Sequence, residues 1–86
     1  MNPHAYNYLG LTYHQQRRYR ETLAAYRQAI AQAPDYAVAY VNLATTTEAL
    51  GQTAQALTAY RQALQYNANL QAVQAKIDAL SKQLGQ

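Results

Sequence analysis

The sequence predicts an all-α fold: a right-handed α-solenoid of two helix-turn-helix repeats followed by a closing helix. Three observations support this prediction. The pentapeptide at residues 25–29 recurs at residues 59–63, an offset of 34 residues, and a fixed period of this length is typical of stacked helical repeats. Aligning residues 3–36 with residues 37–70 gives ten identities in 34 pairs. Within each half, apolar residues recur at the three- and four-residue spacing that places them on one face of a helix.

The first helix is expected to begin at Asn2 and Pro3. Asn is a favoured N-cap residue, and Pro suits the first helical position because its missing N–H would have no partner there. Gly10 lies in the helix interior, where it costs about 1 kcal/mol relative to Ala. We expect its missing side chain to let the second helix approach closely. The residues predicted to face inward are Tyr6, Leu9, Gly10 and Tyr13.

The first turn has two interpretations, because residues 14–27 contain neither Gly nor Pro. In one, the chain turns tightly at Arg17 and Arg18, with one residue in a less favoured backbone conformation. In the other, the first two helices fuse into a single long helix. A fused helix would open the hairpin and promote exchange between chains.

The second helix is expected over residues 19–33 and ends at Pro34, since the residue before a proline is disfavoured in helical geometry. Asp35 is then the expected N-cap of the third helix, which runs from residue 37 to Leu50 and stops at Gly51. The second helix directs inward Leu23, Tyr26, Ala29, Ile30 and Ala33, and the third Tyr40, Leu43, Ala44, Thr47 and Leu50.

Thr53 is the expected N-cap of the fourth helix, and Asn69 that of the fifth. The fifth helix carries a narrow apolar stripe on a polar background, as a closing helix needs for contact with one neighbour and with water. We therefore expect a single domain with repeat 1 at 3–36, repeat 2 at 37–70 and a capping helix at 71–86. The inward residues are Ala56, Leu57, Tyr60, Ala63 and Leu64, followed by Val73, Ile77, Leu80 and Leu84.

The period and these residues resemble the tetratricopeptide repeat family. The matching positions are Tyr6, Leu9, Gly10, Tyr13, Tyr26, Ala29 and Pro34 in the first repeat, and Tyr40, Leu43, Ala44, Ala56, Tyr60 and Ala63 in the second. The sequence departs from the family pattern at Thr22, Thr47 and Ala68, where Ala, Tyr and Pro are usual. The resemblance implies a non-enzymatic protein-binding module in which the first helix of each hairpin lines a concave groove.

Composition excludes several classes of function. The chain has 13% charged residues, a net charge of +3 and no cysteine, so no disulfide and no thiolate metal site can form. Its four acidic residues form no catalytic pair. His4 and His14 are ten residues apart, about 15 Å along a helix, and cannot share a metal ion. We therefore expect no enzyme activity, cofactor, metal or small-molecule substrate.

The N-terminus has no signal-peptide pattern and no apolar run is long enough to span a membrane. We therefore expect no membrane insertion, and the compartment stays open with the cytoplasm favoured. Basic residues cluster only at Arg17, Arg18 and Arg20. This cluster is interpreted as a solvated turn, or alternatively as a contact for an acidic partner or nucleic acid. We do not expect nucleic acid as the partner, because no dense basic stripe is present.

A partner-binding groove is the best candidate site, because an apolar strip rimmed by polar groups is typical of interaction surfaces. Its predicted residues are His4, Asn7, Leu11, His14, Val38, Val41, Asn42, Thr45, Glu48 and Lys76. A partner peptide or helix would gain affinity from the apolar members and orientation from the polar ones.

The best-known groove of the family binds the C-terminal carboxylate of chaperone tails through paired Lys, Asn and Arg side chains. At the corresponding positions this sequence has Asn7, Leu11, Asn42, Ala72 and Lys76. Without the doubled positive charge, capture of a carboxylate should be weak.

Self-assembly is the alternative function. At least three repeats are commonly needed for a stable array, and this chain has two repeats and a closing helix. The outer face of the first hairpin could therefore bind a second copy or further repeats of a longer scaffold. The candidate self-association residues are Tyr8, Tyr19 and Tyr36, with Leu11 beside them.

Overall fold

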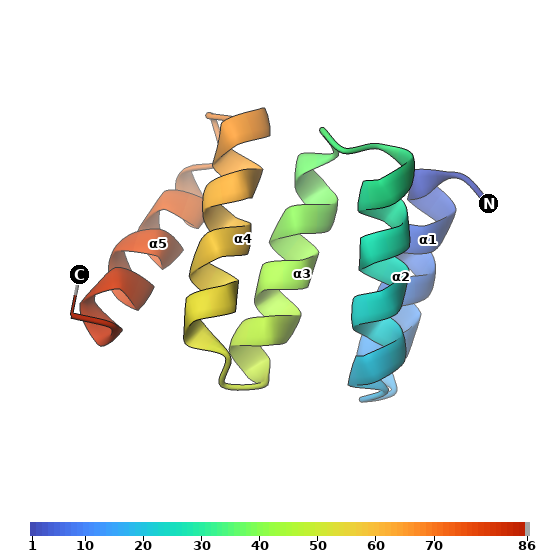
Figure 1. Ribbon diagram of the computed structural model, residues 1–86, viewed down its shortest axis with the longest axis horizontal. Coiled ribbons are helices and arrows are strands. Elements are labelled where there is room, and N and C mark those ends of the chain that lie inside the picture. The colour runs from blue at the N-terminus through green and yellow to red at the C-terminus, as the bar shows by residue number, and fades with distance from the viewer. Residues whose placement is uncertain (86) are drawn as a thin grey trace.

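The computed structural model describes residues 1–85, and that part of the chain folds into five α-helices without a strand (Figure 1). The helices are α1 (Pro3–Gln15), α2 (Tyr19–Gln32), α3 (Ala37–Ala49), α4 (Thr53–Tyr66) and α5 (Gln71–Gln83). The predicted all-α architecture of two helical hairpins and a closing helix is confirmed. Residue 86, at which the predicted capping segment ends, lies outside the described residues.

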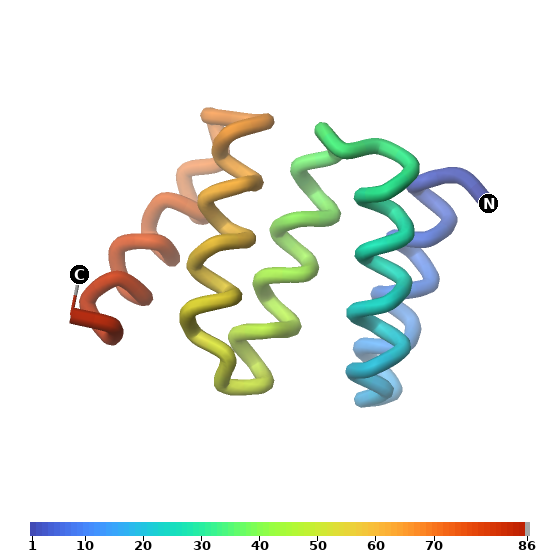
Figure 2. The backbone as a smooth tube through the Cα atoms, viewed as in Figure 1, coloured from blue at the N-terminus to red at the C-terminus, as the bar shows by residue number. Residues whose placement is uncertain are grey.

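The helices stack in one direction along the molecule. α1 pairs with α2 and α3 pairs with α4, while α2 also packs on α3 and α4 packs on α5. The hairpin of α1 and α2 therefore forms one end of the stack and α5 the other, as Figures 1 and 2 show. The molecule measures 38 × 26 × 17 Å. Within residues 1–85, the outer side of α1 and α2 packs against no other helix.

The start of α1 agrees with the sequence. The Asn2 Oδ1 atom accepts a hydrogen bond of 2.8 Å from the Ala5 backbone N–H, and Pro3 occupies the first helical position. The side-chain oxygen satisfies one of the N–H groups that a helix start leaves without an intrahelical partner. The predicted N-cap is therefore confirmed.

The other three predicted N-caps are wrong. Tyr36, Gln52 and Leu70 hold the cap positions of α3, α4 and α5, and none of their side chains makes a capping hydrogen bond. Asp35 lies one residue before the actual cap of α3. It is part of a β-turn in which the Tyr36 N–H donates a 3.0 Å hydrogen bond to the Ala33 carbonyl. The two other predicted caps are also displaced by one residue: Thr53 is already the first residue of α4, and Asn69 precedes the cap of α5.

The first turn forms, and the helices do not fuse. Arg17 has a φ of 59°, in the left-handed region, and the Arg18 N–H donates a 2.9 Å hydrogen bond to the Tyr13 carbonyl. The second hairpin makes the same turn, with Gly51 at a φ of 77° and a 2.9 Å bond from Gln52 to Thr47. This is the helix ending in which one left-handed residue lets the next N–H reach back to a free carbonyl.

Gly10 permits the close approach of α1 and α2, as predicted. A Cβ atom placed there would lie 2.6 Å from Cδ1 of the Tyr26 ring. Tyr26 has only 1% of its surface exposed, so the ring fills the space that a side chain at position 10 would take. The first hairpin is therefore packed around this pair.

The core differs from the predicted stripes at several residues. Leu23 and Ile30 are only half-buried, while Leu50 and Leu84 are each 39% exposed. Thr22, which was not among the predicted inward residues, is fully buried. Its hydroxyl donates a 2.8 Å hydrogen bond to the Arg18 backbone carbonyl. Buried hydroxyls are tolerated when hydrogen-bonded. Around α3, α4 and α5 the core consists of Ala44, Ala56, Leu57, Ala59, Tyr60, Val73, Ile77 and Leu80.

Candidate functional site

The residues predicted for the partner-binding groove lie on α1, α3 and α5, the first helices of successive hairpins together with the closing helix. We call the surface that these residues form the groove. Ten residues were predicted for it. Seven of them make side-chain hydrogen bonds or ion pairs: His4, Asn7, His14, Asn42, Thr45, Glu48 and Lys76. An eighth, Leu11, lines a small pocket. The polar side chains of the groove are thus held in fixed positions.

The pair Asn7 and Asn42 joins α1 to α3. The Asn42 Nδ2 atom donates a 2.8 Å hydrogen bond to the Asn7 Oδ1 atom. Asn7 is only 7% exposed, whereas Asn42 is half-buried. Asn7 therefore supports the groove from beneath and orients the Asn42 amide, whose oxygen and second N–H carry the remaining capacity for hydrogen bonds.

A second polar contact joins the same two helices further along. The His14 Nδ1 atom lies 2.9 Å from the Thr46 hydroxyl oxygen, and the Thr46 hydroxyl lies 3.1 Å from the Asn42 carbonyl oxygen. Between these contacts is a small pocket of about 50 Å³, lined by Leu11, His14, Tyr26, Asn42, Thr45 and Thr46. A pocket of this size accommodates a water molecule or a methyl group, so a larger ligand would lie over the groove rather than enter it.

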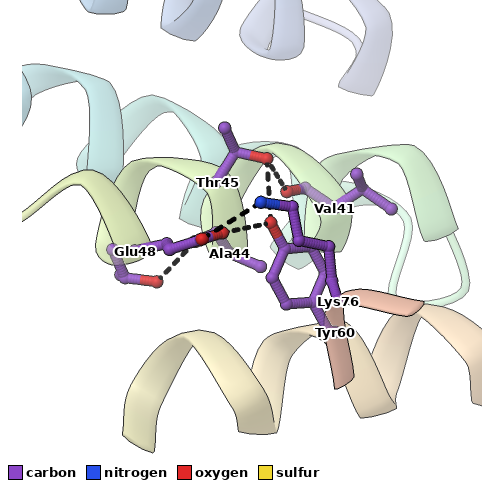
Figure 3. Close-up of polar contacts among 7 residues, drawn as sticks. Val41, Ala44, Thr45, Glu48, Tyr60 and Lys76 are labelled. Atoms are coloured by element: carbon purple, nitrogen blue, oxygen red, sulfur yellow. Dashed lines mark hydrogen bonds and ion pairs between the residues drawn. The ribbon is translucent and has the colours of Figure 1, made fainter. Parts of the chain in front are cut away.

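Glu48 links α3 to α4 and α5 (Figure 3). Its Oε1 atom accepts a 2.9 Å hydrogen bond from the Tyr60 hydroxyl, and its Oε2 atom lies 3.1 Å from the Lys76 Nζ atom. The hydrogen bond and the negative charge of Glu48 raise the pKa of Lys76 above its usual value. Burial raises the pKa of Tyr60, and the bond to Glu48 adds to that increase. Lys76, the only predicted cation of the groove, is therefore already paired.

The apolar part of the groove is partly open to solvent. Leu11 is 38% exposed and Val38 is 48% exposed, while Val41 is half-buried against the core. Thr45 is exposed. Its hydroxyl donates a 2.9 Å hydrogen bond to the Val41 backbone carbonyl. Leu11 and Val38 are thus the side chains most available to a partner.

Two tyrosines predicted for self-association contact histidines predicted for the groove. The Tyr36 hydroxyl lies 3.1 Å from His4 Nδ1, and the two rings meet edge to face with centroids 5.1 Å apart. Tyr19 meets His14 in the same way at 5.5 Å. Both tyrosines are half-buried, whereas Tyr8 is 74% exposed. Neither edge-to-face contact was predicted, because it depends on how the turns place residues beside α1.

Three further features that the sequence raised concern metal binding, membrane spans and the Arg cluster. No group of three His, Asp or Glu side chains in residues 1–85 could hold a metal ion. None of the five helices is both long and apolar enough to cross a membrane. In the Arg cluster, Arg18 pairs with Glu21 at 2.7 Å and lies 4.8 Å from the centre of the Tyr13 ring.

Stacked helical hairpins with a groove of fixed polar groups and exposed apolar side chains define a helical-repeat scaffold. A model of the tetratricopeptide repeat family matches residues 3–67, so the chain belongs to this family. Its members are generally non-enzymatic interaction scaffolds. The family resemblance given by the sequence is thereby confirmed.

Solved structures show the same fold at low sequence identity. The crystal structure of MamA aligns with a TM-score of 0.92 and 23% identity, covering 98% of this chain and 46% of that one. The TPR2B domain of yeast Sti1, solved as a complex with pHsp70, aligns with a TM-score of 0.86 and 18% identity, covering 95% and 66%. The chain thus spans about half and about two thirds of these two chains. A search of curated protein sequences found no match.

Proposed function

We propose that the chain binds a peptide or helix of a partner protein along the groove of α1, α3 and α5. The observation that carries this proposal is the exposure of Leu11 and Val38 on a surface whose polar side chains are already fixed by one another. Exposed apolar area beside ordered polar groups favours association, because burial of about 1 Å² of such area contributes about 25 cal/mol. The structure of the Sti1 domain as a pHsp70 complex supports a protein partner for this fold.

The shape of the groove favours a peptide over a small molecule. Its pocket has a volume of about 50 Å³, far below the roughly 300–1,000 Å³ of pockets that bind small molecules. Contact with a partner would therefore be spread over the surface. Leu11 and Val38 would provide the apolar contacts, and the free groups of Asn42 and the imidazoles of His4 and His14 would orient the ligand.

Selection of peptides from a random display library on the immobilised protein would test the proposal. Selected peptides should bind the wild type, and the double variant Leu11→Ser and Val38→Ser should bind at least about tenfold more weakly, as expected for loss of two apolar contacts. Leu50→Ser is the matched control, because Leu50 is 39% exposed but lies at the C-terminal end of α3, outside the groove. Equal loss in the control variant, or none in the groove variant, would exclude the groove as the site.

Self-assembly is the second candidate function, and the exposure of Tyr8 favours it. At 74%, its side chain is the most exposed of the large apolar residues in the described chain. The solution mass, measured by light scattering over a hundredfold concentration range, separates the two candidates. A constant mass near 9.6 kDa favours the groove, while a dimer that Tyr8→Ser dissociates would favour self-assembly.

A further inference from the structure

The outer side of the first hairpin has a hollow of about 240 Å³, which we call the end hollow. All of its lining residues belong to α1 and α2: Tyr6, Leu9, Tyr13, Glu21, Ala24, Ala25 and Gln28. The first three were predicted as inward residues of a core. They are only half-buried, and they lie at the end of the stack that α1 and α2 form in residues 1–85 (Figure 1).

The second hairpin has the same hollow one period further along. It has a volume of about 270 Å³, and six of its residues are the 34-residue counterparts of end-hollow residues: Leu43, Thr47, Gln55, Thr58, Ala59 and Gln62. Here α2 lies beside the hollow, which itself stays open, with Gln55, Thr58 and Gln62 exposed. α2 packs on α3, and Arg27 of α2 borders the hollow. Tyr40 and Thr47 are accordingly buried, at 7% and 4% exposed, whereas their counterparts Tyr6 and Tyr13 are not.

The two hollows differ in charge. Arg27 of α2 borders the second hollow, and the end hollow has an acidic residue where the second hollow has a neutral one. Gln55 lines the second hollow, and its counterpart in the end hollow is Glu21. The Glu21 carboxylate is 41% exposed and accepts a hydrogen bond from Arg18 through one oxygen. A carboxylate has about four acceptor sites, so a second guanidinium can bind there. A helix placed like α2 would therefore bring its arginine toward a negative charge.

We propose that the end hollow docks an amphipathic helix of a partner protein whose contacting face resembles that of α2, with an arginine that pairs with Glu21. A second folded copy of this chain does not supply such a face, because the corresponding sides of α2 and α4 are covered by α3 and α5. The polar outer side of α5, with Gln74, Asp78 and Lys82, does not match an apolar hollow. A helix of a partner protein with such a face and an arginine fits both the apolar lining and Glu21, at a surface separate from the groove.

The test uses a capped synthetic peptide with the sequence of residues 19–33, which contains the helix face with Arg27 that borders the second hollow. The ¹⁵N-labelled protein is titrated with this peptide, and amide shifts are followed by NMR. We expect saturable shifts at Tyr6, Leu9, Tyr13 and Gln28 with half-saturation on the order of 1 mM or below, since a peptide that folds on binding loses part of its interaction energy. A peptide with Arg27→Glu should bind at least about threefold more weakly, as for one surface ion pair.

Two matched variants of the protein decide the site. Ala24→Glu places a charge in the end hollow on an exposed helix position, and it should abolish the shifts. Thr58→Glu makes the same change at the counterpart position of the second hollow, where α2 already packs on α3, and should leave peptide binding unchanged. Circular dichroism verifies that both variants fold. No shifts up to 2 mM peptide, or shifts that survive Ala24→Glu, would overturn the proposal. Concentration-dependent dimerisation that Ala24→Glu removes would also overturn it, in favour of a second copy.

Discussion

Arg17 and Gly51 occupy the same backbone position one repeat apart, and both have a left-handed φ, at 59° and 77°. Glycine adopts this conformation without a steric penalty, whereas a residue with a Cβ atom loses about 1–2 kcal/mol. We therefore predict that Arg17→Gly stabilises the chain by about 1 kcal/mol, or about 4–8 °C in Tm for a domain of this size. Thermal unfolding followed by circular dichroism measures the change.

The matched control for this prediction is Arg17→Ala. It removes the same charge from the cluster with Arg18 and Arg20 but keeps a Cβ atom in the left-handed position. If the gain came from relief of charge repulsion, both variants would be stabilised equally. A gain confined to the glycine variant identifies the backbone as the cause.

The Gly10 position leads to a prediction of the opposite sign. Gly10→Ala would gain about 1 kcal/mol of helix propensity, but its Cβ atom would overlap the Tyr26 ring, which is buried and cannot move into solvent. Overpacking of a core costs about 1–3 kcal/mol, so we expect net destabilisation of about 1 kcal/mol, measured by urea unfolding.

A double-mutant cycle checks this explanation. In the background of Tyr26→Leu the ring is absent, and Gly10→Ala should then stabilise the chain through helix propensity alone. Mutations of residues in direct contact are expected to be non-additive. Additive effects of the two substitutions would show that the close approach of α1 and α2 does not limit position 10.

The helices could be predicted because their pattern is local. Hydrophobic spacing, Pro34 and Gly51 mark where the helices run and end, and the 34-residue period identifies the repeat. The sequence left the first turn open between a tight turn at Arg17 and Arg18 and a fused helix, although Gly51 is aligned with Arg17 in the second repeat. The caps could not, because the choice between Asp35 and Tyr36 depends on a β-turn whose closing hydrogen bond shifts the helix start by one residue.

The polar network of the groove could be predicted only in part. The helical stripe placed Asn7, Asn42 and His14 on the inner surface, but their pairing depends on the register between α1 and α3, which no local pattern determines. Thr46 was absent from the predicted site for the same reason, although it bonds to His14. The end hollow could not be predicted because Tyr6 has the residue type of a core position, and its accessibility depends on which helices pack beside α1 and α2.

Buried tyrosines predict a loss of stability in alkali. Burial raises the pKa of Tyr26 from 10.0 to about 12, so the unfolded chain releases this proton at lower pH than the folded chain. The free energy of unfolding should be unaffected below about pH 10 and should fall as the pH rises through 12, because the folded state then binds more protons. Urea unfolding between about pH 9 and pH 12 measures the decrease, on the order of 2 kcal/mol from this group.

Tyr26→Phe is the control, since it keeps the ring and removes the titrating hydroxyl. Its stability should decline less steeply over the same range. Burial also raises the pKa values of Tyr40 and Tyr60, so a smaller decline should remain in the variant. Identical pH profiles for the two proteins would show that ionisation of Tyr26 does not contribute to alkaline unfolding.

The pairing of Glu48 with Lys76 predicts the response of the groove to acidic ligands. Lys76 is the only cation at the groove positions, and the carboxylate of Glu48 lies 3.1 Å from its Nζ atom. A peptide ending in acidic residues should therefore bind poorly, with a dissociation constant above about 1 mM, since it must compete with an ion pair already formed. Glu48→Gln removes the competing charge and retains an acceptor for the Tyr60 hydroxyl. We expect affinity for such a peptide to rise by about three- to tenfold and to fall again with added salt.

Asp78→Asn is the matched control for Glu48→Gln. Like Glu48→Gln, it removes one negative charge from the protein. Asp78 lies on α5, however, and its carboxylate accepts a hydrogen bond from Gln74 rather than from Lys76. Isothermal titration calorimetry of the wild type and both variants with one acidic peptide separates local from overall electrostatics. A rise confined to Glu48→Gln identifies Glu48 as the group that blocks carboxylate binding at Lys76. An equal rise in both variants would attribute it to net charge, and no rise would mean that Lys76 does not face the bound ligand.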